Sequence, residues 1–325
     1  MTYQADLSAI GLSADSTISG LNAQVASLQA ELASTKAKSA ADIAALNAEI
    51  ARLNAIIAGQ NPPPVYPPPV VTPPSGSALR FKPPVLTSPV VIDLNKGQTI
   101  PKVLDNTKDY RIILPTNSAV TRAGTGLEVI GGRNTVIVGG LVKVSPSGGV
   151  ARAAYIKDNV GTVHLEGVRF QTTTGDFTEG IDMSCPNAVV QIQNCWVDGL
   201  CSGSYATNHA DIIQTWNGPK TLRVDGLKGR TNYQVAFLNA RDTNASAQPI
   251  EGTWEIHRGD FESVNGAYTL WLVTPPATVK TSKVHCWGTS KGEWKPAMWP
   301  GILHTKPTED FTGGAGLTYV SPGYL

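Results

Sequence analysis

The chain has 325 residues, of which 41% are apolar, and its 26 Lys and Arg residues nearly balance its 25 Asp and Glu residues. This composition excludes a wholly disordered protein and predicts one large domain or two to three smaller ones. The absence of a basic block argues against a general nucleic-acid binder. No apolar run approaches the ~18 residues that cross a bilayer, and the start, MTYQADLSA, lacks a signal peptide's features. We therefore expect a soluble chain, made without a secretory signal and without membrane insertion.

The four cysteines are too few and too scattered for a disulfide framework, and no His or Cys cluster has the spacing of zinc ligands. They are Cys185, Cys195, Cys201 and Cys286. We expect free, mostly buried thiols and no metal site. A catalytic thiol is the alternative interpretation, although none lies among basic residues.

Residues 1–58 lack proline, and their apolar residues alternate at spacings of three and four. One heptad position holds Leu7, Ala14, Leu21 and Leu28, and the other holds Ile18, Val25 and Leu32. After a four-residue shift the pattern resumes with Ile43, Leu46, Ile50, Leu53 and Ile57. This pattern predicts an N-terminal α-helical coiled coil, a rod roughly 80 Å long. The alternative is one amphipathic helix packed on the downstream domain.

Residues 59–77 form the next segment, in which eight of the fourteen residues from Asn61 to Pro74 are proline. Such a segment predicts an extended polyproline II linker between two ordered parts. A PxxP ligand for an SH3-type domain is the alternative.

Residues 78–287 carry a repeat of about 30 residues, a length typical of solenoids. We align its copies on Val138, Leu165, Ile192, Val224, Ile256 and Cys286. A second short strand precedes each copy, at 127–130, 154–157, 181–184, 211–214, 235–238 and 269–272. Short strands without helices predict an all-β right-handed parallel β-helix, whose N-terminal end residues 90–100 would cap. Residues 288–325 would be a C-terminal extension or cap.

Two stretches carry a resemblance to a known family. The end, DFTGGAGLTYVSPGYL (310–325), resembles the C-terminal signature of minor tail proteins from phages of actinobacteria, and NHADIIQTWNGPKTLRVDGL (208–227) resembles a coil of their β-helix. A rod, a proline-rich linker and a pectate-lyase-like β-helix together resemble bacteriophage tail fibres. The resemblance implies a virion tail component that faces the host surface, and trimeric fibres of this kind imply a homotrimer. The heptad residues from Ile43 to Ile57 by themselves favour a dimer instead.

Polar and aromatic residues gather around the fourth coil, beside inserted loops at 201–208 and 241–248. As carbohydrate-binding residues we expect His209, Asp211, Gln214, Trp216, Tyr233 and Arg241. Asp182 and Asp211 are candidate acid and base of a glycosidase, and Arg241 is a candidate base of a lyase. The alternative is that these polar side chains only satisfy backbone groups at coil turns. The paired Asp-Asp and Gly-His-Gly motifs of pectin-cleaving enzymes are absent.

The sequence thus favours a structural virion tail fibre or minor tail protein that binds a host cell-envelope glycan and needs no cofactor. Its expected partners are two further copies of itself, other tail proteins through residues 1–58, and the glycan. One alternative is a tailspike depolymerase, a hydrolase or lyase that cleaves the glycan. Another is a purely architectural element without a ligand.

Overall fold

The computed structural model describes residues 18–29, 32, 78–203, 208–240, 252–264, 270–274, 278–288 and 315–325. The chain divides into two compact units, residues 1–71 and residues 72–325. Residues 204–207 of the inserted loop predicted at 201–208, and all of the loop predicted at 241–248, lie outside the described residues.

In the first unit, residues 18–29 are helical and fully exposed along their length. The apolar side chains of Ile18, Leu21, Val25 and Leu28 are each more than half exposed. Their spacing of three and four residues places them on one face of the helix, which needs a partner to be buried. The other residues of the predicted rod lie outside the described part, except Leu32. No helix in the described residues forms an apolar span of membrane-crossing length.

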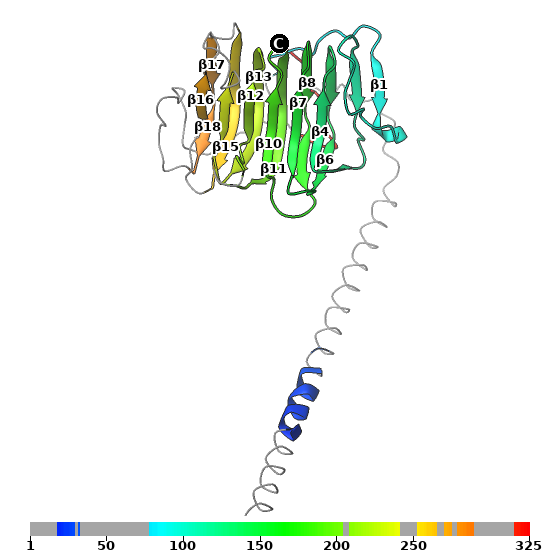
Figure 1. The fold of residues 1–325 in the computed structure, drawn as a ribbon, viewed down its shortest axis with the longest axis vertical. Helices are drawn as coiled ribbons and strands as arrows, with labels where there is room; N and C mark the ends of the chain where they lie inside the picture. The colour runs from blue at the N-terminus through cyan, green and yellow to red at the C-terminus, as the bar shows by residue number, and fades with distance from the viewer. Residues whose placement is uncertain are drawn as a thin grey trace, which may run out of the picture. The chain divides into compact units, whose positions relative to one another are not determined.

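The described residues of the second unit form parallel strands and one short 3-10 helix, η1 (Leu94–Lys96). A 12-stranded sheet has the main path β1-β2-β5-β8-β11-β13-β15-β17, with β3, β6, β9 and β18 attached beside it, and a 6-stranded sheet has the order β4-β7-β10-β12-β14-β16. Figure 1 shows these strands stacked in chain order from β1 to β17. The strands of the 12-stranded sheet are β1 (Val90–Asp93), β2 (Tyr110–Ile113), β3 (Val120–Ala123), β5 (Thr135–Val138), β6 (Leu141–Ser145), β8 (Thr162–Glu166), β9 (Arg169–Thr172), β11 (Val189–Cys201), β13 (Thr221–Thr231), β15 (Thr253–Ser263), β17 (Thr278–Ser282) and β18 (His285–Trp287). Those of the 6-stranded sheet are β4 (Thr125–Ile130), β7 (Arg152–Lys157), β10 (Glu179–Ser184), β12 (Ile213–Asn217), β14 (Ala236–Asn239) and β16 (Leu270–Thr274).

Each strand pairs in parallel with the strand one coil earlier and one coil later, which is compatible with the predicted β-helix. The predicted N-terminal strand is β1, which ends the path of the large sheet and pairs with β2. The small sheet contains the second strand of every predicted repeat. Repeat length and alternation were therefore sufficient to find the strands of the small sheet.

The large sheet turns a corner at a row of left-handed residues, where φ is positive. Gly167, Asn194, Gly226 and Arg258 occupy this row in four successive coils, with φ between 47° and 85°. Glycine adopts this conformation without the steric cost of a Cβ atom. In the earlier coil a pair of glycines, Gly139 and Gly140, makes the same turn. Gly139 and Gly140 thus form the corner of that coil.

The core is built from inward-facing rows that run through successive coils. In the large sheet one row contains Ile137, Leu165, Ile192, Val224 and Ile256, all at most 2% exposed. The alignment of Leu165, Ile192, Val224 and Ile256 as equivalent positions is therefore confirmed. It was wrong for Val138, which is 43% exposed and pairs with Glu166.

Cys286 was also misaligned with the core row. It pairs with Phe261, on the strand portion beyond the corner, whereas Ile256 pairs with Thr281. Because apolar residues occur on both sides of each corner, the repeat pattern alone did not distinguish the two positions. All four cysteines are buried and free, as expected.

The C-terminal residues 315–325 pack against the large sheet and the start of the second unit. Tyr319 lies over Gly139 and Gly167, where a Cβ atom at residue 167 would overlap its ring. The hydroxyls of Tyr319 and Tyr324 both donate to the buried carboxylate of Glu166. The backbones of Leu79 and Leu325 are hydrogen-bonded as well. The two ends of this unit are therefore held side by side.

Candidate functional site

The outer face of the small sheet brings the predicted site residues together. Its register places one outward position of every coil in a single row: Glu128, Tyr155, Asp182, Gln214, Phe237 and Trp271. Neighbouring positions of such a row are about 4.8 Å apart, so their side chains contact one another. The row changes along the body from charged and polar to aromatic.

The polar part of this face is an acidic cluster, formed by Arg152, Glu179, Asp182, Asp211 and Gln214. Arg152 Nε lies 2.6 Å from Asp182 Oδ2 and 2.5 Å from Glu179 Oε2, so one guanidinium bridges two carboxylates. Asp211 follows the loop that leads into β12, and its backbone carbonyl accepts from the amide of Gly180. Asp182, Asp211 and Gln214 are at most 1% exposed.

Burial controls the protonation of this acidic cluster. It raises the pKa of Asp182 well above its ordinary value, and the charge of Glu179 raises it further against the opposing effect of Arg152. Burial also raises the pKa of Asp211, with added repulsion from Asp182 and Glu179. Both oxygens of Asp211 and both amide atoms of Gln214 lack a hydrogen-bond partner among the described residues. A neutral carboxyl group at Asp211 is the form that this environment favours.

Beside the acidic cluster lies an aromatic cluster formed by His209, Trp216, Tyr233, Phe237 and Trp271. The His209 ring stacks on Tyr233 and on Trp216, with centroids 5.6 Å and 6.2 Å apart. Phe237 contacts Trp216 at 6.1 Å and meets Trp271 edge-to-face at 5.4 Å. Trp216 is 45% exposed, and the other four members are partly buried. The aromatic cluster therefore presents a supported indole ring to solvent.

The position of Trp216 has a local cause. The pairing of β10 with β12 shifts by one residue after Met183, so that Ser184 pairs with Asn217 and Trp216 is left as the extra residue of a bulge. Bulges redirect a side chain out of the regular alternation. Trp216 therefore belongs to β12 but departs from its regular alternation.

The structure thus brings together His209, Asp211, Gln214, Trp216 and Tyr233, with Asp182 in the adjoining coil. Arg241 lies outside the described residues. Neither Asp182 nor Asp211 reaches solvent, so direct contact with a polymer would require the side chains around them to move. Sequence reasoning missed Phe237 and Arg152. Only the strand register reveals them, although Phe237 belongs to a strand that was predicted.

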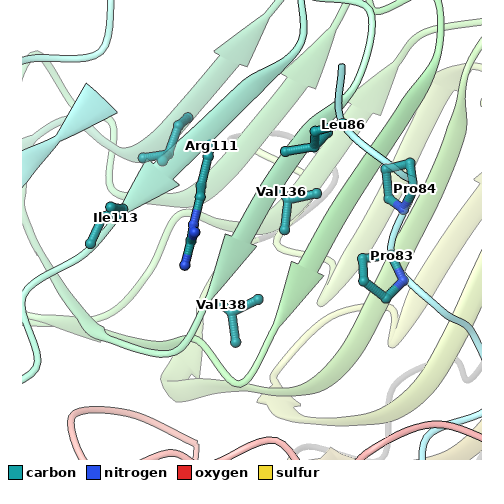
Figure 2. Close-up of a pocket in the computed structure, with 8 residues that line it drawn as sticks. Pro83, Pro84, Leu86, Arg111, Ile113, Val136 and Val138 are labelled. Atoms are coloured by element: carbon teal, nitrogen blue, oxygen red, sulfur yellow. The ribbon is translucent and has the colours of Figure 1, made fainter. Parts of the chain in front are cut away.

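A concave region away from these clusters lies on the large sheet, as Figure 2 shows. It is a pocket of about 290 Å³ between the chain at Pro83, Pro84 and Leu86 and the outer residues of β2 and β5, which include Val136 and Arg111. Its walls are mostly apolar, and none of the predicted site residues lines it.

Within the described ranges, no group of three or more His, Cys, Asp or Glu side chains is arranged to hold a metal ion. Comparisons of the whole chain with protein-family models, with curated proteins and with solved structures found no match. The geometry of the site and the resemblance of its motifs therefore carry the functional argument.

Proposed function

We propose that this chain is a bacteriophage tail fibre or minor tail protein that binds a glycan of the host cell envelope. The observation that carries the proposal is the aromatic cluster, where Trp216 is 45% exposed and supported by stacked rings. An exposed indole ring stacks well on the apolar face of a sugar, and neighbouring polar groups bind hydroxyls. The body would be a right-handed parallel β-helix, which holds these rings on a rigid sheet.

The N-terminal unit would attach the protein to the tail. The exposed apolar side chains of Ile18, Leu21, Val25 and Leu28 on one helix face support a coiled coil between copies of the chain. In this proposal three copies form the rod, residues 1–58 contact other tail proteins, and the proline-rich residues 59–77 project the body. The protein would be located in the virion and need no cofactor.

Incubation of the full-length protein with envelope polysaccharide from an actinobacterial host tests this proposal. Retention on the polysaccharide without loss of polymer size supports a glycan-binding tail protein. A fall in polymer size would instead support the depolymerase alternative with Asp182 and Asp211. No retention on any envelope fraction would contradict the proposal and leave an architectural role.

A further inference from the structure

Three side chains on the outer face of the large sheet form a chain of hydrogen bonds that the proposed function does not use. β15 and β17 are paired strands, and their register places Ser282 beside His257. Ser282 Oγ lies 2.5 Å from His257 Nδ1, and Glu255 Oε2 lies 3.3 Å from His257 Nε2. A hydroxyl, an imidazole and a carboxylate are thus connected in that order.

The hydrogen bonds define the tautomer of this imidazole. A carboxylate only accepts, so Nε2 of His257 carries the proton and donates it to Glu255. Nδ1 then has a lone pair and accepts from the Ser282 hydroxyl. This is the polarity that general-base activation of a serine requires, with the carboxylate holding the ring in place.

The imidazole of His257 is buried, whereas the hydroxyl-bearing residue Ser282 is exposed to solvent. His257 is 6% exposed, while Ser282 is exposed at the end of the last strand in the path of the large sheet. Burial lowers the pKa of His257, and the nearby charge of Arg80 acts in the same direction against that of Glu255. The neutral imidazole, which is the basic form, is therefore favoured at neutral pH.

A related trio three coils earlier shows what a purely structural version looks like. His164 lies between Glu166 and Gln191, and all three side chains are at most 3% exposed. Its second partner is an amide rather than a hydroxyl, and Tyr324 of the C-terminal segment lies beside it. In the earlier coil the hydrogen bonds of the histidine are thus made without a hydroxyl group. In the later coil an exposed serine takes the place of the amide.

We propose that Ser282, His257 and Glu255 form an acyl-transfer site that hydrolyses small carboxylic esters, such as acetyl esters of sugar hydroxyls. Ser282 and His257 are the catalytic residues, and Glu255 is a positioning residue. This activity goes beyond glycan binding and does not depend on the aromatic cluster, which lies on the other sheet.

In the first half of the reaction, Ser282 Oγ bonds to the ester carbonyl carbon while its proton moves to His257 Nδ1. The ester C–O bond then breaks, and the proton on Nδ1 passes to the leaving alcohol. In the second half, water attacks the acyl-serine, its proton moves to Nδ1 and then to Ser282 Oγ, and the carboxylic acid leaves. Ester and water are consumed, alcohol and acid are formed, and the protein is restored. Lys280, exposed on the same face of β17, would place positive charge near the anionic intermediate.

The test uses the full-length protein, a fluorophosphonate probe and p-nitrophenyl acetate. We expect the probe to form an adduct on Ser282, and we expect Ser282→Ala and His257→Gln to lower the hydrolysis rate by at least about 100-fold. Ser147→Ala, which removes another exposed serine hydroxyl, is the matched control and should leave the rate unchanged. Circular dichroism of Ser282→Ala should be unaltered, because the serine is exposed.

The Glu255→Gln variant tests whether Glu255 positions the His257 imidazole for catalysis or only stabilises the fold. Loss of its negative charge removes stabilisation of the imidazolium, so the acidic limb of the pH–rate profile should move to lower pH while the plateau falls. Absence of a Ser282 adduct, or a folded Ser282→Ala variant as active as the unaltered chain, would overturn the proposal. Because binding of polysaccharide is measured separately, failure here leaves the proposed function intact, and the converse also holds.

Discussion

Replacement of Ile192 by alanine tests the register of the core most sharply. Ile192 is 0% exposed and lies between Leu165 and Val224 in the inward row. The change removes three carbon atoms, worth about 0.8 kcal/mol each in transfer free energy, and leaves a cavity between two coils. We expect the free energy of unfolding to fall by about 2–5 kcal/mol, which corresponds to a loss of roughly 4–20 °C in melting temperature. Ile192→Asp, which buries an unpaired charge, should prevent folding of the body.

Two valines provide a matched control for the same experiment. Val224 is 0% exposed and Val138 is 43% exposed, so Val224→Ala should destabilise the protein clearly and Val138→Ala should cost less than about 0.5 kcal/mol. Urea and thermal unfolding followed by circular dichroism would measure all three variants. Equal effects of Val138→Ala and Val224→Ala, or a negligible effect of Ile192→Ala, would refute the register.

Three further predictions concern other parts of the chain. Burial raises the pKa of Cys185 and Cys195 to about 12 and raises that of Cys201 and Cys286 as well, so iodoacetamide at pH 8 should alkylate no cysteine before unfolding; rapid alkylation of the native chain would contradict the buried assignment. Burial would raise the pKa of Glu166, but hydrogen bonds from His164, Tyr324, Ser321 and Tyr319 outweigh it and lower that pKa below its ordinary 4.5. Docking of residues 315–325 is therefore fully stabilised above pH 4.5 and weakens as pH falls through the lower folded value, which hydrogen-exchange protection factors would show; constant protection down to pH 2 would be the contrary result. Sedimentation of the full chain should give a trimer, and a monomer or dimer would exclude that assembly.

The strands of the small sheet, and those at the aligned positions of the large sheet, were predictable because alternation and repeat length act locally. The row at Ile137 was misplaced because Val136, Ile137 and Val138 are all apolar, so a period of two residues does not distinguish them. Register is a property of pairing between coils, and a run of three apolar residues contains no information about it.

The candidate site was predictable in its residues more than in its geometry. Clustered polar and aromatic residues identified His209 and Trp216, but nothing local indicated that Asp182 and Asp211 are buried. The Ser282–His257–Glu255 chain was not foreseen either, because its members come from two strands that only folding aligns. Docking of Tyr319 and Tyr324 on Glu166 spans more than 150 residues of sequence and was equally beyond local patterns.

The most direct test of glycan binding is calorimetric titration of host-envelope polysaccharide into two tryptophan variants of the full-length protein. Trp216→Ala removes the exposed ring of the aromatic cluster, whereas Trp196→Ala removes a partly buried ring on the large sheet, where it stacks with Arg169. We predict that Trp216→Ala weakens binding about 5- to 30-fold in a protein that still folds, since one stacking ring contributes about 1–2 kcal/mol, and that Trp196→Ala binds like the unaltered chain. Unchanged affinity of Trp216→Ala, in a protein that does bind the polysaccharide, would place the glycan site elsewhere and contradict the account.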